Sequence, residues 1–309
     1  MDKLKVAVVG TGYLGRIHAK LYKEIENCSL EAVCDIDETR LNSLSQELGV
    51  KGVRDYKELF GKVDAVSIAV PTKLHFQVSS AFLENNIHTL VEKPFTENLR
   101  QADALIKLAQ KNGLTLQVGH IERFNSAFSA TQKIITEPKF IECHRLSPFP
   151  NRSIDIGVVL DLMIHDIDIV IGLVGSGIKR IEAVGVPVLT RFEDIANARI
   201  TFRNGCVANL TASRVSEEAM RKIRIFQKDT YISLDYREAK ASVYKKSAFS
   251  ITKEDLPIEK EQPLKKELES FVTCVIKRQE PLVSGPIARE ALSVALTIQK
   301  HIWNKKNIF

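Results

Sequence analysis

The first part of the chain alternates between short apolar runs and longer segments in which apolar residues recur every three or four positions. Short apolar runs are typical of strands covered on both faces, and the periodic segments are typical of helices. Strands are expected at residues 4–9, 30–35, 63–70, 87–91 and 114–118, and helices at 38–48, 74–85 and 99–111. Because strands and helices take turns along the chain, the pattern predicts a doubly wound parallel sheet.

The pattern changes near residue 120, where short β-rich segments separated by turn residues follow one another. Strands are expected at residues 141–146, 181–188, 196–202, 206–213, 221–226, 231–235 and 241–244, and helices at 158–173, 263–277 and 286–303. Short strands joined by turns such as Asn204-Gly205 favour an antiparallel sheet. The sequence therefore predicts an α/β protein with a first domain at residues 1–119 and a second at 120–309. The final helix could pack back on the first domain.

A glycine-rich turn follows the first expected strand directly. Gly10 permits a tight turn, Gly12 lets the backbone approach a pyrophosphate, and Gly15 lets the next helix pack closely on the sheet. The N-terminus of that helix offers free N–H groups to phosphate oxygens. Glycines at this spacing also occur in unrelated turns, but the strand before them and the helix after them favour a dinucleotide-binding Rossmann domain.

Asp35 lies twenty residues after Gly15, at the end of the second expected strand. A carboxylate at this place can accept hydrogen bonds from both ribose hydroxyls of the adenosine, and it would repel a 2′-phosphate. The predicted cofactor is therefore NAD. Arg40 follows closely and could tolerate a phosphate, so NADP remains the less favoured alternative.

The composition is that of an ordinary soluble protein of 309 residues, 44% hydrophobic and 27% charged. No apolar run approaches the roughly 20 residues of a membrane span. The first strand begins at Leu4, which leaves no room for a secretory signal. The five cysteines are odd in number and never spaced as C-x-x-C, which argues against disulfides and a zinc site. We therefore expect a cytoplasmic protein without a membrane segment.

The net charge of +6 is unevenly placed. Residues 1–119 hold 15 basic and 15 acidic side chains, whereas residues 120–309 hold 29 and 23. A basic second half suits an anionic substrate, although a solvated surface with surplus lysines explains the same count. Nucleic-acid binding is disfavoured, because acidic residues lie among the basic ones and no recognition motif accompanies them.

Two further motifs carry candidate chemistry. In Glu92-Lys93-Pro94 the lysine ends a predicted parallel strand, where its side chain would reach the cofactor crevice, although most lysines at strand ends are plain surface residues. In the expected helix at 158–173, Asp161 and His165 are four residues apart and share a face. A carboxylate beside an imidazole suits a general base, but such a pair is also an ordinary helix contact. A metal site is not expected, because no second histidine lies nearby.

The glycine turn, Glu92-Lys93-Pro94 and Asp161-x-x-x-His165, in this order and at these separations, resemble the glucose-fructose oxidoreductase, inositol dehydrogenase and MocA (Gfo/Idh/MocA) family over essentially the whole chain. The resemblance implies a Rossmann domain followed by an α/β domain whose open antiparallel sheet mediates homodimers or homotetramers. It also implies oxidation of a sugar or polyol. The lysine, aspartate and histidine of the family correspond to Lys93, Asp161 and His165.

Within the family, residues 119–125, 152–155 and 159–168 resemble the branch of UDP-N-acetylglucosamine 3-dehydrogenases. Many relatives carry a Gly-Gly pair before the aspartate and a glycine ahead of the histidine, where this chain has Gly157-Val158 and Met163-Ile164. The branch implies oxidation of the C3 hydroxyl of UDP-N-acetylglucosamine. Two alternatives stay open, a dehydrogenase of a free polyol or aldose and a nicotinamide-binding sensor without turnover.

The resemblance also implies a role for each site residue. His165 would take the hydroxyl proton, Lys93 would stabilise the negative charge that develops on the same oxygen, and Asp161 would orient His165. Arg123 and Arg152 are candidates for binding the substrate with His165, because guanidinium groups suit pyrophosphate oxygens. The residues expected to line the cofactor are Gly10, Gly12, Tyr13, Leu14, Gly15, Asp35, Pro71, Thr72, His75, Glu92 and Lys93.

Overall fold

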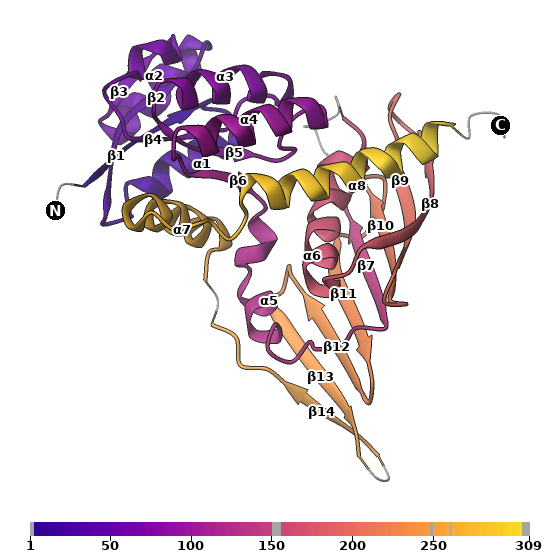
Figure 1. Ribbon diagram of the computed structural model, residues 1–309. Coiled ribbons are helices and arrows are strands. Elements are labelled where there is room, and N and C mark those ends of the chain that lie inside the picture. Colours follow the sequence, from indigo (N-terminus) through magenta and orange to yellow (C-terminus); the bar gives the residue numbers. More distant parts are fainter. Residues whose placement is uncertain (1–2, 150–155, 248–249, 260, 305–309) are drawn as a thin grey trace. The chain divides into compact units, whose positions relative to one another are not determined.

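The computed structural model describes residues 3–149, 156–247, 250–259 and 261–304 (Figure 1). The chain forms two compact units. The first comprises Met1–Ile121 and Gln262–Arg289, and the second comprises Glu122–Glu261 and Glu290–Phe309. The domain boundary expected at residue 119 remains a prediction.

The first unit is built on a six-stranded parallel sheet with the strand order β3-β2-β1-β4-β5-β6. Its strands are β1 (Leu4–Val9), β2 (Cys28–Cys34), β3 (Lys51–Val53), β4 (Ala65–Ile68), β5 (His88–Glu92) and β6 (Leu116–Gly119). The chain order reverses between β1 and β4, which is the point where doubly wound sheets bind ligands. The predicted Rossmann topology is confirmed, and only the three-residue β3 is absent from the sequence prediction.

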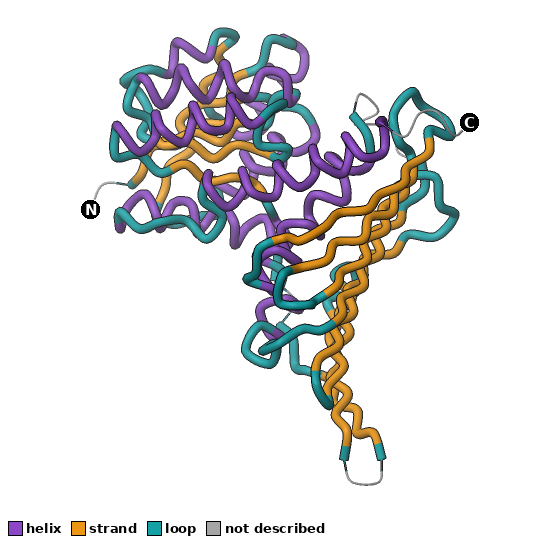
Figure 2. Tube along the Cα trace, turned by 45° about the vertical axis from the view of Figure 1, so that its right-hand side comes forward, coloured by secondary structure: helices purple, strands orange, loops and turns teal. Residues whose placement is uncertain are grey.

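Helices cover both faces of this sheet (Figure 2). They are α1 (Tyr13–Tyr22), α2 (Glu38–Leu48), α3 (Thr72–Glu84), α4 (Leu99–Lys111) and α7 (Pro263–Lys277), with a 3₁₀ turn at Tyr56–Leu59. α3 packs against α4, and α1 packs against α7. Leu268 and Phe271 of α7 share a core with Val6 and Val8 of β1. A helix near the end of the chain, α7, therefore packs into the same hydrophobic core as the first strand, β1.

Side-chain caps explain why two helices have the bounds expected from sequence. The carboxylate of Asp37 accepts a hydrogen bond from the Arg40 N–H at the start of α2, and the side chain of Asn98 accepts one from the Gln101 N–H at the start of α4. Such caps satisfy backbone donors that a helix leaves unpaired at its N-terminus. At the end of α2, Gly49 adopts φ 63°, a conformation that glycine reaches without steric cost.

The second unit is built on an eight-stranded sheet with the order β14-β13-β12-β11-β7-β10-β9-β8. Its strands are β7 (Phe140–Leu146), β8 (Ile178–Val186), β9 (Ile195–Phe202), β10 (Val207–Ser213), β11 (Met220–Gln227), β12 (Thr230–Asp235), β13 (Lys240–Lys246) and β14 (Ile251–Asp255). Every pair is antiparallel except β7 with β10. The predicted α/β class with a mainly antiparallel second sheet is confirmed.

Helical segments cover one face of the eight-stranded sheet (Figure 1). They are a 3₁₀ turn at Ile121–Phe124, α5 (Ser126–Thr131), a π-helical turn at Val159–Met163, α6 (Ile164–Val174) and the later part of α8 (Gly285–Asn304). The helix expected at residues 158–173 is thus a π turn followed by an α-helix. Residues on one side of each strand are buried and those on the other are partly exposed, as in β7, because only one face is covered.

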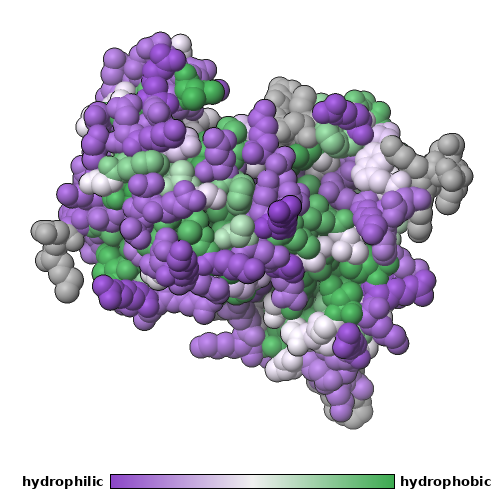
Figure 3. Space-filling model, turned by 45° about the horizontal axis from the view of Figure 1, so that its top comes forward, coloured by the Kyte–Doolittle hydropathy of each residue, from purple (hydrophilic) through white to green (hydrophobic). Residues whose placement is uncertain are grey.

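The surface seen in Figure 3 is mostly polar, with smaller apolar patches between the charged side chains. Among the described helices, none combines the length and apolar character that a membrane crossing requires.

Candidate active site

The glycine turn after β1 has the geometry that its sequence predicts. Gly10 adopts φ +92°, and a Cβ there would lie 2.6 Å from the carbonyl oxygen of Ala69. A Cβ at Gly15 would lie 1.7 Å from the Gly10 carbonyl oxygen, so α1 packs directly on the turn. A Cβ at Gly12 would have no neighbour within 4 Å, and no side chain caps the N-terminus of α1. The turn therefore leaves space at Gly12, beside a helix N-terminus that has no side-chain cap, where a pyrophosphate would bind.

Asp35 is fixed at the carboxyl end of β2, beside the glycine turn. Its Oδ2 accepts hydrogen bonds from the Thr11 N–H at 2.7 Å and the Thr11 hydroxyl at 2.9 Å, and its Oδ1 accepts one from the Asp37 N–H at 2.8 Å. Burial would raise the pKa of this carboxyl, but these bonds and the Arg40 guanidinium at 3.3 Å keep the pKa below its usual value. Asp35 is thus an ionised acceptor, as recognition of a ribose diol requires.

His75 braces the ends of two neighbouring strands. The side chain is buried, with Nδ1 2.9 Å from the Pro94 carbonyl oxygen and Nε2 2.9 Å from the Val70 carbonyl oxygen. Burial lowers the pKa of this imidazole, although both carbonyls oppose the shift. His75 therefore positions the segments after β4 and β5, and a direct contact with the cofactor stays a prediction.

The remaining cofactor candidates lie close to these strand ends. Pro71 and Thr72 begin α3, which follows β4 directly. Tyr13 and Leu14 begin α1, with Tyr13 exposed and Leu14 half-buried. Their roles in cofactor binding remain predictions.

Glu92 ends β5 in a tightly packed polar cluster. Its Oε1 lies 3.1 Å from Nε2 of His18, which is completely buried in α1. Burial favours the neutral carboxyl, yet His18 and the Lys93 ammonium hold the pKa of Glu92 below its usual value. A Cβ at Gly119 would lie 2.9 Å from the Glu92 carboxylate, so glycine is needed at the end of β6. The next peptide bond, Lys93-Pro94, is cis.

Asp161 and His165 belong to the second unit. Asp161 lies in the π-helical turn and His165 in the first turn of α6, and both side chains are half-buried. The Asp161 N–H donates to the Gly157 carbonyl oxygen at 3.0 Å. The expectation that the two residues share a face assumed 3.6 residues per turn, but the wider π turn changes that angle. Short π segments inside helices recur at functional sites.

Two buried ion pairs anchor α6 directly after His165. Asp166 accepts two hydrogen bonds from the guanidinium of Arg145, at 2.8 and 3.0 Å, and Arg145 also donates to Glu122 at 2.7 Å. Burial raises the pKa of Asp166 although Arg145 opposes the shift. Two residues further along α6, Asp168 pairs with Arg123 at 2.6 and 3.0 Å.

Of the two arginines predicted to bind substrate, the structure describes only Arg123. Arg123 forms the ion pair with Asp168 and also donates to the Asp168 carbonyl oxygen at 2.8 Å. These contacts give Arg123 a role that needs no substrate, and its part in substrate binding stays a prediction. Arg152 lies outside the described residues.

The first unit also contains a cavity of about 650 Å³ lined by residues that include His88, Thr115 and Arg278. The cavity lies near the amino ends of β5 and β6 and contains none of the predicted site residues. Ligands of doubly wound sheets bind at the opposite, carboxyl ends of the strands. The cavity is therefore separate from the cofactor site.

Comparison with known proteins identifies the family. Residues 4–120 match the oxidoreductase family with an NAD-binding Rossmann fold, and residues 130–232 match the GFO/IDH/MocA C-terminal domain. The sequence is 36% identical over 306 residues to the UDP-N-acetylglucosamine 3-dehydrogenase of Acidithiobacillus ferrooxidans, covering 97% of each chain. The chain belongs to the Gfo/Idh/MocA family.

One solved structure and one more distant sequence relative agree with this family assignment. A structure of the Acidithiobacillus ferrooxidans enzyme covers 98% of each chain with a TM-score of 0.93. The myo-inositol 2-dehydrogenase of Thermotoga maritima is a more distant Gfo/Idh/MocA relative, 27% identical over 99% of this chain and 98% of its own. The predicted family resemblance is confirmed.

As a Gfo/Idh/MocA member, the protein is an NAD-dependent oxidoreductase. The residues present fit NAD. The uncapped N-terminus of α1 and the open space at Gly12 suit the pyrophosphate, and the Asp35 carboxylate suits the adenosine ribose.

The sequence did not predict that two residues of the first unit lie beside the Glu92 carboxylate. His18 and Gly119 both contact or border Glu92, but they lie 74 and 27 positions away from it in the chain. The signal for His18 was its place three residues after Gly15, on the buried side of α1. Nothing in the sequence around Gly119 indicates which side chain needs the space.

Proposed function

We propose that this protein oxidises the C3 hydroxyl of UDP-N-acetylglucosamine to a ketone with NAD. The observation that carries the proposal is the similarity to the UDP-N-acetylglucosamine 3-dehydrogenase, which extends over 97% of both chains and therefore over both units. The basic surplus of residues 120–309 supports an anionic substrate. Inositol dehydrogenases match with lower identity, so a free polyol is the second candidate.

The proposal assigns the chemistry to three side chains. His165 accepts the proton of the C3 hydroxyl as a general base, a role worth about 10²–10⁴ in rate. Lys93 donates a hydrogen bond to the same oxygen and stabilises its developing charge. Asp161 orients the imidazole. NAD, when bound, would accept the C3 hydrogen as a hydride, that is, with both electrons of the C–H bond.

The first test measures absorbance at 340 nm with NAD and, separately, with NADP. UDP-N-acetylglucosamine is compared with inositol and glucose at equal concentrations. We expect reduction of NAD by the nucleotide sugar alone. Reduction by inositol or glucose instead would replace the substrate and keep the family, and no reduction with any substrate would favour a sensor without turnover.

A second test identifies the carbon and the base. The product is reduced with borodeuteride, and NMR should find deuterium at C3 of both epimers. Deuterium at another carbon would contradict the assignment. His165→Ala should lower kcat by about 10²–10⁴ while the Kd for NAD, measured by protein fluorescence, stays unchanged. An unchanged kcat would exclude His165 as the base.

We also propose that the protein is a homo-oligomer that associates through the open face of the eight-stranded sheet. Aromatic rings form a continuous row on this face across four strands, with centroid separations of 5.7, 4.7 and 4.9 Å between neighbours. The row consists of Phe140, Phe226, Tyr231 and Tyr244. At the other end of the sheet Val184, Val186 and Ile195 are 55%, 40% and 37% exposed. Apolar groups on an uncovered face are typical of a protein interface.

Sedimentation equilibrium at micromolar concentration tests this assembly. Wild type should sediment as a dimer or tetramer, and Tyr231→Lys should shift the population toward the monomer. Lys253→Gln on the exposed edge strand β14 serves as the control. A monomeric wild type would contradict the proposal.

The cytoplasm is the proposed location. All five cysteines are buried and free, as in proteins that fold in a reducing compartment.

A further inference from the structure

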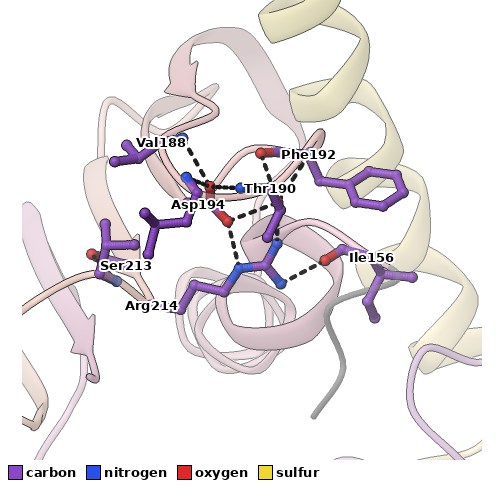
Figure 4. A network of polar contacts seen from close by, with 9 residues as sticks. Ile156, Val188, Thr190, Phe192, Asp194, Ser213 and Arg214 are labelled. Atoms are coloured by element: carbon purple, nitrogen blue, oxygen red, sulfur yellow. Dashed lines mark hydrogen bonds and ion pairs between the residues drawn. The ribbon is translucent and has the colours of Figure 1, made fainter. Parts of the chain in front are cut away.

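Arg214 and Asp194 form an ion pair in the second unit that is completely buried on both sides. The Arg214 Nε donates to Asp194 Oδ1 at 2.7 Å. Figure 4 shows the guanidinium pointing into a loop between β8 and β9, with Thr190 and the Ile156 carbonyl on its other donors. Burying two opposite charges costs several kcal/mol of desolvation, so such a pair is weak evidence for stability by itself.

The carboxylate of Asp194 organises the β8–β9 loop. Its Oδ2 accepts hydrogen bonds from three successive backbone N–H groups, those of Val188, Leu189 and Thr190, at 2.8, 2.6 and 2.8 Å. Its Oδ1 accepts one from the Thr190 hydroxyl at 2.8 Å. With the guanidinium added, Oδ1 accepts two hydrogen bonds and Oδ2 accepts three, so the carboxylate ties the loop together (Figure 4).

The same network forms hydrogen bonds with Ile156 and Val158, directly before the π turn. The Arg214 Nη1 donates to the Ile156 carbonyl oxygen at 2.7 Å, and the Val158 N–H donates to the Glu193 carbonyl oxygen at 2.9 Å. Gly157 lies over the Glu193 carboxylate so closely that a Cβ would come within 2.0 Å of it. Three consecutive residues are thus held by the loop and by Arg214.

The fixed segment is continuous with the residues to which the chemistry is assigned. The Asp161 N–H donates to the Gly157 carbonyl oxygen, so the π turn starts from the clamped backbone. His165 follows four residues after Asp161 at the start of α6. A shift of the clamp would therefore move Asp161 relative to α6, which is anchored separately through Asp166 and Asp168.

We propose that Arg214 is a positioning residue for the reaction, because it clamps Ile156–Val158 and thereby sets the position of Asp161 relative to His165. The inference rests on the proposed function for the roles of those two residues. Arg214 itself contacts neither of them in any hydrogen bond described above. A displacement of about 1 Å at a catalytic group can cost about 10²-fold in rate, which is the scale of effect that the clamp would prevent.

Four variants test the proposal. Arg214→Leu should lower kcat about 10²-fold, and Arg214→Lys, which keeps the charge but has a single donor nitrogen, should recover part of that loss. The Asp194→Asn/Arg214→Leu double variant removes both charges but keeps a side-chain oxygen that can accept from the loop N–H groups, so it should regain stability relative to Arg214→Leu while kcat stays low. Ile225→Ala in the core of β11 lowers stability without touching the clamp, and its kcat at a temperature well below its Tm should stay near that of wild type.

A readout without substrate separates this proposal from the proposed function. NMR of histidine-labelled protein reports the tautomer and chemical shifts of the His165 imidazole. We expect these signals to change in Arg214→Leu and in the double variant, but not in Ile225→Ala. The Kd for NAD should not change in any variant, because the glycine turn lies in the first unit.

Two outcomes would overturn the proposal. One is a double variant that regains both its Tm and the full kcat, which would make the pair merely structural. The other is an unchanged His165 spectrum in Arg214→Leu. Failure of wild type to oxidise UDP-N-acetylglucosamine would refute the proposed substrate and leave the NMR comparison valid.

Discussion

Asp194 in the second unit and Glu267 in the first are both completely buried carboxyl groups, but their surroundings differ. Asp194 has an arginine, a hydroxyl and three backbone N–H groups on its two oxygens. Neither oxygen of Glu267 has a hydrogen-bond partner among the described residues, and the nearby charge is that of another carboxyl, Glu92. Burial alone therefore does not determine the state of a carboxyl group, and its partners do.

The difference appears in the two pKa values. Burial raises both, but hydrogen bonds and Arg214 bring the pKa of Asp194 far below its usual value. At Glu267 burial and the Glu92 charge act in the same direction and raise the pKa well above 4.5. Asp194 is thus held in its ionised form, whereas the surroundings of Glu267 favour its protonated form. The contacts of Asp194 hold the β8–β9 loop in place. The raised pKa of Glu267 makes the stability of the first unit depend on pH.

Of the substitutions that test this comparison, Asp194→Ala should lower the free energy of unfolding most. The substitution leaves the Arg214 guanidinium buried without its counterion and three N–H groups without an acceptor, at a cost of about 3–5 kcal/mol. For a domain of 150–250 residues this corresponds to a fall in Tm of about 2–4 °C per kcal/mol. Calorimetry and urea unfolding measure the change. A loss below about 1 kcal/mol would contradict this hydrogen-bond network.

Gly157→Ala tests the same cluster from its backbone side. The new Cβ would force the Glu193 carboxylate away from its two donors, Gln299 Nε2 at 3.0 Å and Trp303 Nε1 at 3.2 Å. Hydrogen bonds to charged groups contribute about 1.5–3 kcal/mol each, so a loss of about 2 kcal/mol is expected. Gly177→Ala, where a Cβ meets only ordinary contacts at 3.4 Å or more, is the control. Equal Tm values for the two variants would count against a tight fit at Gly157.

Glu267→Gln should raise the stability of the folded state, whereas the two preceding variants lower it. The unfolded chain releases the Glu267 proton near pH 4.5, while the folded chain keeps it to a higher pH. The folded state then binds more protons, so stability contributed at this site falls as pH rises above 4.5, by about 1.4 kcal/mol for each unit of raised pKa. Glutamine removes this loss and keeps the shape of the neutral acid.

The measurement for Glu267→Gln is the Tm across pH 4 to 9. The variant should equal wild type near pH 4 and become progressively more stable than wild type as pH rises. Glu269→Gln, on the exposed side of the same helix, should show no such trend. A variant that is less stable than wild type at neutral pH would show that the ionised carboxyl has partners of its own.

The sequence predicts some of these features because their causes are local. The bounds of α2 and α4 follow from the periodic apolar residues together with the caps at Asp37 and Asn98. Asp35 could be placed because its distance from the glycine turn is set by one strand and one helix. Glu267 also left a signal, since it lies in the apolar stripe of α7 between Leu264 and Leu268.

Other features depend on contacts that the sequence does not display. The π turn at Val159–Met163 arises in a segment clamped by Arg214, which lies more than fifty positions away. Two short elements, β3 and α5, contain too few residues for a periodic pattern to emerge. The parallel pairing of β7 with β10 requires the long connection between them to be known.

Gly119→Ala should give the smallest effect, and it tests Glu92, a buried carboxyl of the first unit that has an ionisable partner, His18. A Cβ at 2.9 Å from Glu92 would press that carboxylate away from His18, at a cost of about 1 kcal/mol. The His18 contact keeps the pKa of Glu92 below 4.5, so its stabilisation is present above pH 4.5 and is lost as pH falls through the folded pKa. The Tm difference from wild type should therefore be largest at neutral pH and shrink on acidification. A difference that is constant with pH would mean that the methyl group costs only steric energy and that the His18 pair survives. The trend also distinguishes the two carboxyls, because above pH 4.5 Gly119→Ala lowers the Tm through Glu92 whereas Glu267→Gln raises it.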